Sequence, residues 1–203
     1  MSSEVEVASP QEAYCGKRAL DIVAAAAACT AFTPAAAMVT LATWLEDGGS
    51  PLFLQTRVGR GREPFTIFKF RSMRAQRVTL VGQWLRRTGI DEWAQFLNVC
   101  RGDMSVVGPR PLTADDLRRL GWTDDRTDWR FATKPGITGL SQLFGGRSAR
   151  ASLRLDRLYL RRQSLSLDLR LIALSFAANV VGKRTIRRLR QRSKDRRQGA
   201  YCI

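Results

Sequence analysis

The sequence contains no histidine. That absence excludes Ser-His-Asp hydrolysis, histidine-based acid and base catalysis and most zinc sites. Proton transfer near neutral pH must therefore use carboxylates, cysteine, lysine or water. The sequence also lacks paired cysteines, because the four that it has form no CxxC motif, and free thiols in a reducing compartment fit better than a disulfide framework. These four are Cys15, Cys29, Cys100 and Cys202.

Acidic residues are few. The chain has 18 aspartates and glutamates against 34 lysines and arginines, which gives a net charge of +16. This balance indicates polyanionic partners, which could be nucleic acid, anionic lipid headgroups or phosphorylated substrates. The length of 203 residues allows one domain with a substantial core and excludes a three-domain protein.

Long apolar runs are also scarce, and the one that stands out is the uncharged stretch of residues 22–45. It is long enough to cross a bilayer, which takes about 20 apolar residues. A cleavable signal peptide is disfavoured, because the run starts late and is followed directly by Glu46 and Asp47. Since alanine dominates the run, a buried helix of a soluble protein is the alternative.

Basic residues flank this run on both sides: Lys17, Arg18, Arg57, Arg60 and Arg62. The positive-inside rule therefore places both flanks on the cytoplasmic side. Pro34, preceded by Thr33, lies near the middle of the run and removes a backbone hydrogen bond, so a kink is expected there. We expect a re-entrant membrane helix over residues 17–47, broken at Thr33 and Pro34. The alternative is a single-pass anchor, which would export a very basic domain.

Two shorter patterns follow the apolar run. Residues 65–73 have the pattern of a strand in which Lys69 and Arg71 share one face. The spacing of Lys69 and Arg71 alone fits an ordinary solvent-exposed strand edge equally well. Residues 74–85 have the pattern of a small amphipathic helix near the membrane surface.

Residues 86–99 combine arginines with two adjacent carboxylates. Thr88 and Asp91 have the spacing of a capping box, and apolar residues recur at the helical period, so we expect a helix that begins between them. Asp91 and Glu92 would lie in its first turn, where the helix dipole stabilises a carboxylate by about 0.3–1 kcal/mol. Such carboxylates are ordinary caps in many helices, but they can also serve as a nucleophile or as metal ligands.

Cations suited to phosphate oxygens accompany the acidic pair: Lys69, Arg86 and Arg110. Pro109 and Pro111 restrict the backbone on both sides of Arg110, which predicts a stiff loop. The glycines of residues 135–139 would let the backbone approach a ligand closely, and Arg147 adds a cation in a flexible turn.

Several of these motifs carry a resemblance together: residues 69–73, 86–99, 102–111 and 134–142. In this order they resemble the successive motifs of the bacterial monotopic phosphoglycosyl transferases. That family of small sugar transferases moves a sugar-1-phosphate from a nucleotide sugar to a polyprenyl phosphate. The similarity runs from about residue 17 to about residue 182, and several separated motifs in the right order are far more specific than any one alone.

The resemblance implies a mechanism in which Asp91 attacks a UDP-sugar held by Mg²⁺. It makes Asp91 and Glu92 the catalytic and metal-binding pair and assigns phosphate or substrate binding to the cations Lys69, Arg86, Arg110 and Arg147. The implied partners are a UDP-sugar, undecaprenyl or another polyprenyl phosphate, and anionic lipids of the inner leaflet. The implied location is the cytoplasmic face of the bacterial inner membrane, and the family's re-entrant helix agrees with the one expected from the charge flanks.

Three departures from the family pattern bear on activity. Trp93 and Ala94 stand where relatives usually have Leu-Pro, and residues 145–148 read Gly-Gly-Arg-Ser where relatives tend to have Asn-Gly-Arg-Asn. The segment between residues 73 and 86 is shorter than in many relatives. These departures keep open an impaired family member that acts as a scaffold.

We expect a helix-rich, mixed α/β fold with a single cytosolic globular domain, an N-terminal re-entrant helix and interfacial amphipathic helices. The expected division is a flexible N-terminus, the membrane helix, the catalytic domain and a basic tail: residues 1–16, 17–47, 48–182 and 183–203. Further helices are expected at residues 153–160, with Asp156 and Tyr159 as packing and salt-bridge groups, and at 165–181.

A rival interpretation is a membrane-tethered nucleic-acid-binding protein that uses the basic tail. The core has neither a recognition helix nor an aromatic RNA-binding motif, so we expect no nucleic-acid partner. A homodimer, the sugar and the glycan pathway stay open at this point.

Overall fold

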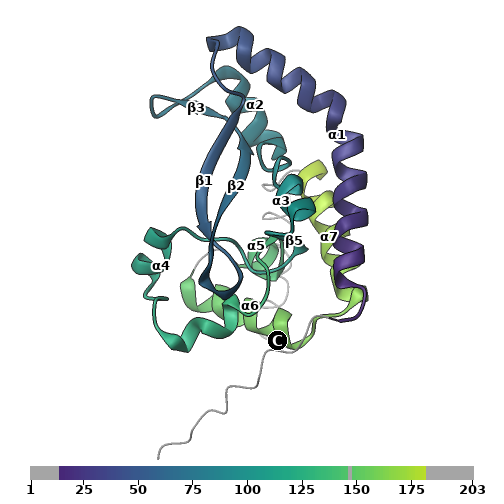
Figure 1. Ribbon diagram of the computed structural model, residues 1–203, viewed down its shortest axis with the longest axis vertical. Helices are drawn as coiled ribbons and strands as arrows, with labels where there is room; N and C mark the ends of the chain where they lie inside the picture. Colours follow the sequence, from purple (N-terminus) through teal and green to yellow (C-terminus); the bar gives the residue numbers. More distant parts are fainter. Residues whose placement is uncertain (1–13, 146–147, 182–203) are drawn as a thin grey trace, which may run out of the picture.

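The computed structural model describes residues 14–145 and 148–181, so the basic tail and residues 1–13 lie outside it. The predicted helix-rich, mixed α/β composition is confirmed (Figure 1). The helices are α1 (Lys17–Asp47), α2 (Leu80–Thr88), α3 (Gln95–Arg101), α4 (Ala114–Leu120), α5 (Leu140–Phe144), α6 (Ala149–Arg161) and α7 (Leu165–Val181). The strands are β1 (Leu52–Val58), β2 (Pro64–Phe70), β3 (Met73–Arg74), β4 (Arg77–Val78), β5 (Ser105–Val107) and β6 (Gly136–Thr138). Short 3-10 helices cover η1 (Arg60–Arg62), η2 (Ile90–Glu92) and η3 (Asp125–Phe131).

Helix α1 runs along one side of the molecule and changes direction about midway along its length (Figure 1). Pro34 lies inside this helix and cannot donate a backbone hydrogen bond. The Thr33 hydroxyl donates to the Cys29 carbonyl over 2.8 Å in the same region. The structure thus has a bend in a continuous helix, and the break at Thr33 and Pro34 stays a prediction.

Much of α1 is exposed. Val23, Met38 and Leu45 expose 68%, 72% and 69% of their surface. Within residues 14–145 and 148–181, α1 is the one helix that is long and apolar enough to cross a membrane. Its first turns differ, because Lys17 and Asp21 are buried and therefore belong to the globular core.

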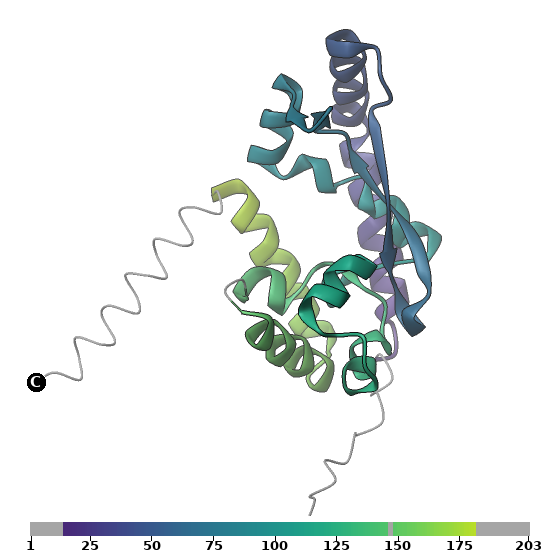
Figure 2. The same ribbon diagram turned by 90° about the vertical axis from the view of Figure 1, so that its left-hand side faces the viewer.

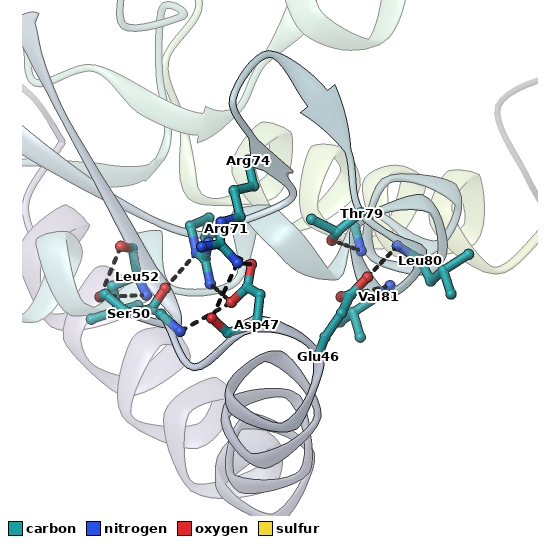
Figure 3. A network of polar contacts seen from close by, with 11 residues as sticks. Glu46, Asp47, Ser50, Leu52, Arg71, Arg74, Thr79, Leu80 and Val81 are labelled. Atoms are coloured by element: carbon teal, nitrogen blue, oxygen red, sulfur yellow. Dashed lines mark hydrogen bonds and ion pairs between the residues drawn. The ribbon is translucent and has the colours of Figure 1, made fainter.

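The far end of α1 is attached to two other elements (Figure 3). The Asp47 carboxylate pairs with both terminal nitrogens of Arg71, at 2.5 and 2.9 Å, just beyond the end of β2. The Glu46 carboxylate accepts hydrogen bonds from the backbone amides of Leu80 and Val81, over 2.7 and 3.3 Å. Those amides belong to the free N–H groups at the start of α2, so the end of α1 caps α2.

The antiparallel pair β1–β2 forms a ribbon that runs from the end of α1 toward α4 and α6 (Figure 1). In Figure 2 this ribbon and α7 lie on opposite sides of the molecule. Strand β2 confirms most of the strand predicted at residues 65–73, but it ends at Phe70. Arg71 therefore binds Asp47, and the prediction that Lys69 and Arg71 point together is wrong.

Residues 73–88 differ from the predicted helix at residues 74–85. Strands β3 and β4 form a hairpin whose turn has Ala75 and Gln76 at positive φ, 46° and 65°. Helix α2 begins only at Leu80, where the Thr79 hydroxyl accepts a hydrogen bond from the Gly82 amide over 2.9 Å. A left-handed turn cannot continue a right-handed helix, so the hairpin displaces the predicted helix start.

A buried polar network joins the start of α1 to β5, α6 and α7. The Lys17 ammonium donates to Asp168 over 2.6 Å and to the Val107 carbonyl over 3.0 Å. The Tyr159 hydroxyl donates to the other oxygen of Asp168 over 2.9 Å. Burial and the Asp168 carboxylate raise the pKa of Tyr159, which keeps this hydroxyl protonated.

Helices α6 and α7 confirm the predictions at residues 153–160 and 165–181. Asp156 and Tyr159 are both buried, and Asp156 pairs with Arg130 over 2.8 Å. The two residues are therefore packing and ion-pair groups, as predicted.

Replacing Lys17 should destabilise the protein strongly. Lys17→Met leaves the buried Asp168 carboxylate without its cation, which typically costs about 3–5 kcal/mol of unfolding free energy. Denaturant unfolding in detergent measures this loss. Arg119→Met is the control, because Arg119 is exposed and its ion pair with Asp116 should contribute about 0–1 kcal/mol. Equal losses in both variants would contradict a special role for the buried pair.

Candidate active site

Asp91 and Glu92 lie in η2, a short turn between α2 and α3. A helical segment begins between Thr88 and Asp91, as predicted, with both acids in its first turn, but it is the 3-10 helix η2, and α3 begins only at Gln95. Thr88 does not cap it, because Thr88 is the last residue of α2 and its hydroxyl donates back to the Trp84 carbonyl over 2.9 Å. Gly89 adopts a left-handed conformation with φ of 75° and ends α2 there. The chain then turns at once, and both carboxylates are half-buried at this junction.

A cavity with about 290 Å³ of space, part of it open to solvent, lies beside this turn. Three cations line it, Arg57, Lys69 and Arg110, together with a single carboxylate, Glu92. The remaining lining residues are apolar or neutral: Ile67, Gln95, Pro111, Gly136, Ile137 and Gln142. The structure thus brings Lys69, Glu92 and Arg110 together, as the sequence predicted.

Lys69 reaches the cavity from β2. Its ammonium lies 3.9 Å from the Glu92 carboxylate, and its side chain is 19% exposed. Burial lowers the pKa of Lys69, and the nearby Glu92 carboxylate opposes this effect. Arg57 and Arg110 lower it further, because like charges disfavour the protonated form. The cavity is therefore short of negative charge.

Arg110 is exposed between two buried prolines, on a loop whose backbone is held from two sides. The Arg110 carbonyl accepts a hydrogen bond from the Arg130 guanidinium over 2.7 Å, and the Gly136 amide donates to the Pro109 carbonyl over 2.8 Å. Arg130 is itself fixed by its buried ion pair with Asp156. These contacts agree with the stiff loop predicted from the two prolines.

Gly136 and Gly139 let their backbone pack directly against the backbone of Gly108. A Cβ atom on Gly136 would lie 2.0 Å from the backbone nitrogen of Gly108, and one on Gly139 would lie 2.3 Å from the Gly108 carbonyl oxygen. These glycines therefore allow β6 to approach the loop after β5. Gly136 also lines the cavity, and the close approach of a ligand to it stays a prediction.

Three polar side chains that line the cavity were not among the predicted site residues: Arg57, Gln95 and Gln142. From the sequence, Arg57 is expected only as a flanking charge of the membrane helix. In the structure its side chain is 13% exposed and bonds to Gln55 and to the Pro111 carbonyl, over 2.6 and 3.3 Å. Burial lowers the pKa of Arg57. The alternation of Gln55 and Arg57 on one face of β1 is the signal that could have indicated this placement.

Other predicted site residues lie elsewhere. Arg86 is exposed on α2, its Nε donates to the Ser72 hydroxyl over 2.9 Å, and it does not line the cavity. Arg147 lies outside the described residues. The substrate roles of both residues stay predictions.

A metal ion would have few protein ligands here. Among the described residues, no group of three or more histidine, cysteine, aspartate or glutamate side chains could hold a metal. Glu92, with Asp91 beside it in the chain, fits Mg²⁺, which commonly binds through one or two carboxylates while water and substrate phosphates complete its coordination.

Three cations around a small cavity, with the Glu92 carboxylate among them, form a site suited to phosphate groups. The chain belongs to the bacterial sugar transferases, because the sequence model of that family matches residues 12–182.

Named relatives agree with this family. The chain is 40% identical over 178 residues to a UDP-glucose:undecaprenyl-phosphate glucose-1-phosphate transferase of Caulobacter vibrioides, covering 77% of this chain and 66% of that protein. It is 35% identical over 188 residues to an Escherichia coli protein of the same name, covering 82% of this chain and 40% of that protein. It is 36% identical over 182 residues to the exopolysaccharide production protein PSS of Rhizobium leguminosarum, covering 77% of this chain and 90% of that protein.

Lys69→Met should change how stability depends on pH. Because the pKa of Lys69 in the folded protein lies below its ordinary 10.5, the unfolded chain binds more protons between the two values. The unfolding free energy of the unmodified protein should therefore rise relative to that of Lys69→Met as the pH increases through this window. Denaturant unfolding of both proteins between about pH 8 and 11 measures the difference. A difference that stays constant with pH would contradict the lowered pKa.

Proposed function

We propose that the protein is a membrane-associated phosphoglycosyl transferase that moves a sugar-1-phosphate from a UDP-sugar to undecaprenyl phosphate. The observation that carries the proposal is the cavity in which Arg57, Lys69 and Arg110 face Glu92 beside Asp91. Cations that outnumber the one carboxylate lining the cavity suit a diphosphate, and the carboxylate of Asp91, next to Glu92 in the chain, suits nucleophilic attack on it. Relatives named as transferases of glucose-1-phosphate and of N-acetylgalactosamine phosphate support the same class.

The reaction has two steps. An oxygen of the Asp91 carboxylate attacks the β-phosphorus of the UDP-sugar and forms a new P–O bond, while the bond to the bridging oxygen breaks and UMP leaves with the electron pair. A phosphate oxygen of the lipid acceptor then attacks the same phosphorus, and the bond to Asp91 breaks to restore the carboxylate. Lys69 and Arg110 hold the phosphate oxygens on which charge builds up in both steps.

Glu92 has a different part from Asp91. It lines the cavity and lies 3.9 Å from Lys69, so it can hold Mg²⁺ and orient the ammonium at the same time. When bound, the ion would neutralise phosphate charge and polarise the bond that breaks. Asp91 would be the second carboxylate able to hold the ion.

The attachment of α1 supports insertion from one side of the membrane. Its first residue pairs with Asp168, and its last residue pairs with Arg71. Because both ends contact the same globular part, a re-entrant helix that leaves both flanks on the cytoplasmic face of the bacterial inner membrane fits better than a straight span. The exposed apolar residues of α1 would face acyl chains, and the basic flanks would face anionic headgroups.

Asp91→Asn tests the nucleophile. UMP release is measured with full-length protein in nanodiscs containing undecaprenyl phosphate and magnesium, using a panel of UDP-sugars. The unmodified protein should release UMP from at least one donor, and Asp91→Asn should be slower by about 10³-fold or more. Without the acceptor, the unmodified protein should release one equivalent of UMP. Equal rates in both proteins would exclude Asp91 as the nucleophile, and no release from any donor by folded protein would favour a scaffold.

Arg110→Ala tests whether Arg110 holds the phosphate oxygens of the substrates. The loss of one preorganised cation should lower UMP release by about 10²–10³-fold, while association with the membrane is unchanged. Arg118→Ala is the matched control, because Arg118 is exposed on α4 and pairs with Asp115 outside the cavity. Near-normal turnover of Arg110→Ala would remove Arg110 from the site.

A further inference from the structure

Gln95 is a largely buried residue whose amide faces the cavity. It is the first residue of α3, is 4% exposed and lines the cavity. Its carboxamide makes no hydrogen bond to any residue in the described part of the chain, yet it is not among the fully enclosed unpaired groups there. The amide is therefore reachable from the cavity and free to bond a ligand in it.

The other buried amides nearby are satisfied. Asn98, in the same helix, accepts a hydrogen bond from the Phe68 amide over 2.9 Å and donates to the Thr66 carbonyl over 2.7 Å. Gln142, which also lines the cavity, donates to the carbonyls of Gly108 and Gly136, over 3.3 and 3.2 Å. The contrast indicates that Gln95 keeps its hydrogen-bonding capacity for a ligand in the cavity.

The backbone places Gln95 beside the acidic pair. Trp93 and Ala94 have right-handed helical torsion angles, so the chain winds in one sense from η2 into α3. Residues three apart in such a segment project from the same side, and Glu92 and Gln95 both line the cavity. A phosphate group held beside Glu92 should therefore lie within reach of the Gln95 amide.

We propose that the Gln95 carboxamide donates a hydrogen bond to an oxygen of the transferred phosphoryl group, the β-phosphate of the donor. A phosphoryl oxygen in a cavity lined by Lys69, Arg57 and Arg110 is anionic and accepts such a bond strongly. The amide is neutral and adds a directed donor without more charge. This inference rests on the proposed transferase activity and makes Gln95 a catalytic residue of that reaction.

Gln95→Leu tests the contact with UDP and UMP as ligands of the full-length protein in nanodiscs. UDP retains the β-phosphate and UMP lacks it. The Kd of UDP should rise about tenfold, because a hydrogen bond to a charged group is lost, while the Kd of UMP changes less than about twofold. UMP release from an accepted UDP-sugar should fall by about 10²-fold, mainly in kcat. Gln83→Leu is the matched control, because Gln83 is exposed on α2 and absent from the cavity.

Stability and a second variant exclude a merely structural role. Since the Gln95 amide bonds to no residue of 14–145 or 148–181, Gln95→Leu without ligand should have a melting temperature equal to or above that of the unmodified protein. In Gln95→Glu the side chain keeps its shape but gains a negative charge, so this variant should weaken the binding of UDP more than Gln95→Leu does. The proposal would be overturned if Gln95→Leu weakened the binding of UDP and UMP equally, or if it left both affinities unchanged. A lowered melting temperature together with equal losses of UDP and UMP binding would overturn it as well. An unmodified protein that neither binds UDP nor releases UMP would instead contradict the proposed function itself.

Discussion

The buried ion pair between Lys17 and Asp168 is the interaction on which the rest of the structure depends. The two side chains are 8% and 0% exposed, and two charges so far from water are stable only when their other hydrogen bonds are made. The Val107 carbonyl and the Tyr159 hydroxyl make them. Because these groups come from α1, β5, α6 and α7, one small network fixes the apolar helix to three elements of the globular part.

The same helix is connected to the cavity at both ends. Near its start, the Asp21 carboxylate accepts hydrogen bonds from the Ser105 hydroxyl and the Val106 amide, each over 2.9 Å, and β5 leads directly into the loop that carries Arg110. At its far end, Asp47 holds Arg71 just after the strand of Lys69, and Glu46 caps the helix that leads to Asp91 (Figure 3). The position of the cavity relative to α1 is therefore fixed from two sides. This arrangement supports a site held at a constant height above the membrane.

Local patterns predicted the elements whose signals are short-range. The strand of Lys69, the helices that contain Tyr159 and Asp168, and the stiff loop of Arg110 follow from periodicity and proline placement. The capping role of Thr88 was wrong, because Thr88 ends α2 and Gly89 closes that helix in a left-handed conformation before η2 begins at Ile90. Arg57 and Gln95 were missed because their roles depend on pairing of β1 with β2 and on burial, which are long-range properties.

The size of the cavity bears on why a covalent step suits this site. The cavity is small, and on the proposed function the same three cations serve the phosphates of both substrates. A diphosphate and a lipid phosphate bound together would compete for Arg57, Lys69 and Arg110. If the substrates must use the cavity in turn, the phosphosugar has to remain on the protein between the two visits. Asp91 is half-buried and precedes the cavity-lining Glu92 in the chain, which supports a mechanism in which Asp91 holds the phosphosugar.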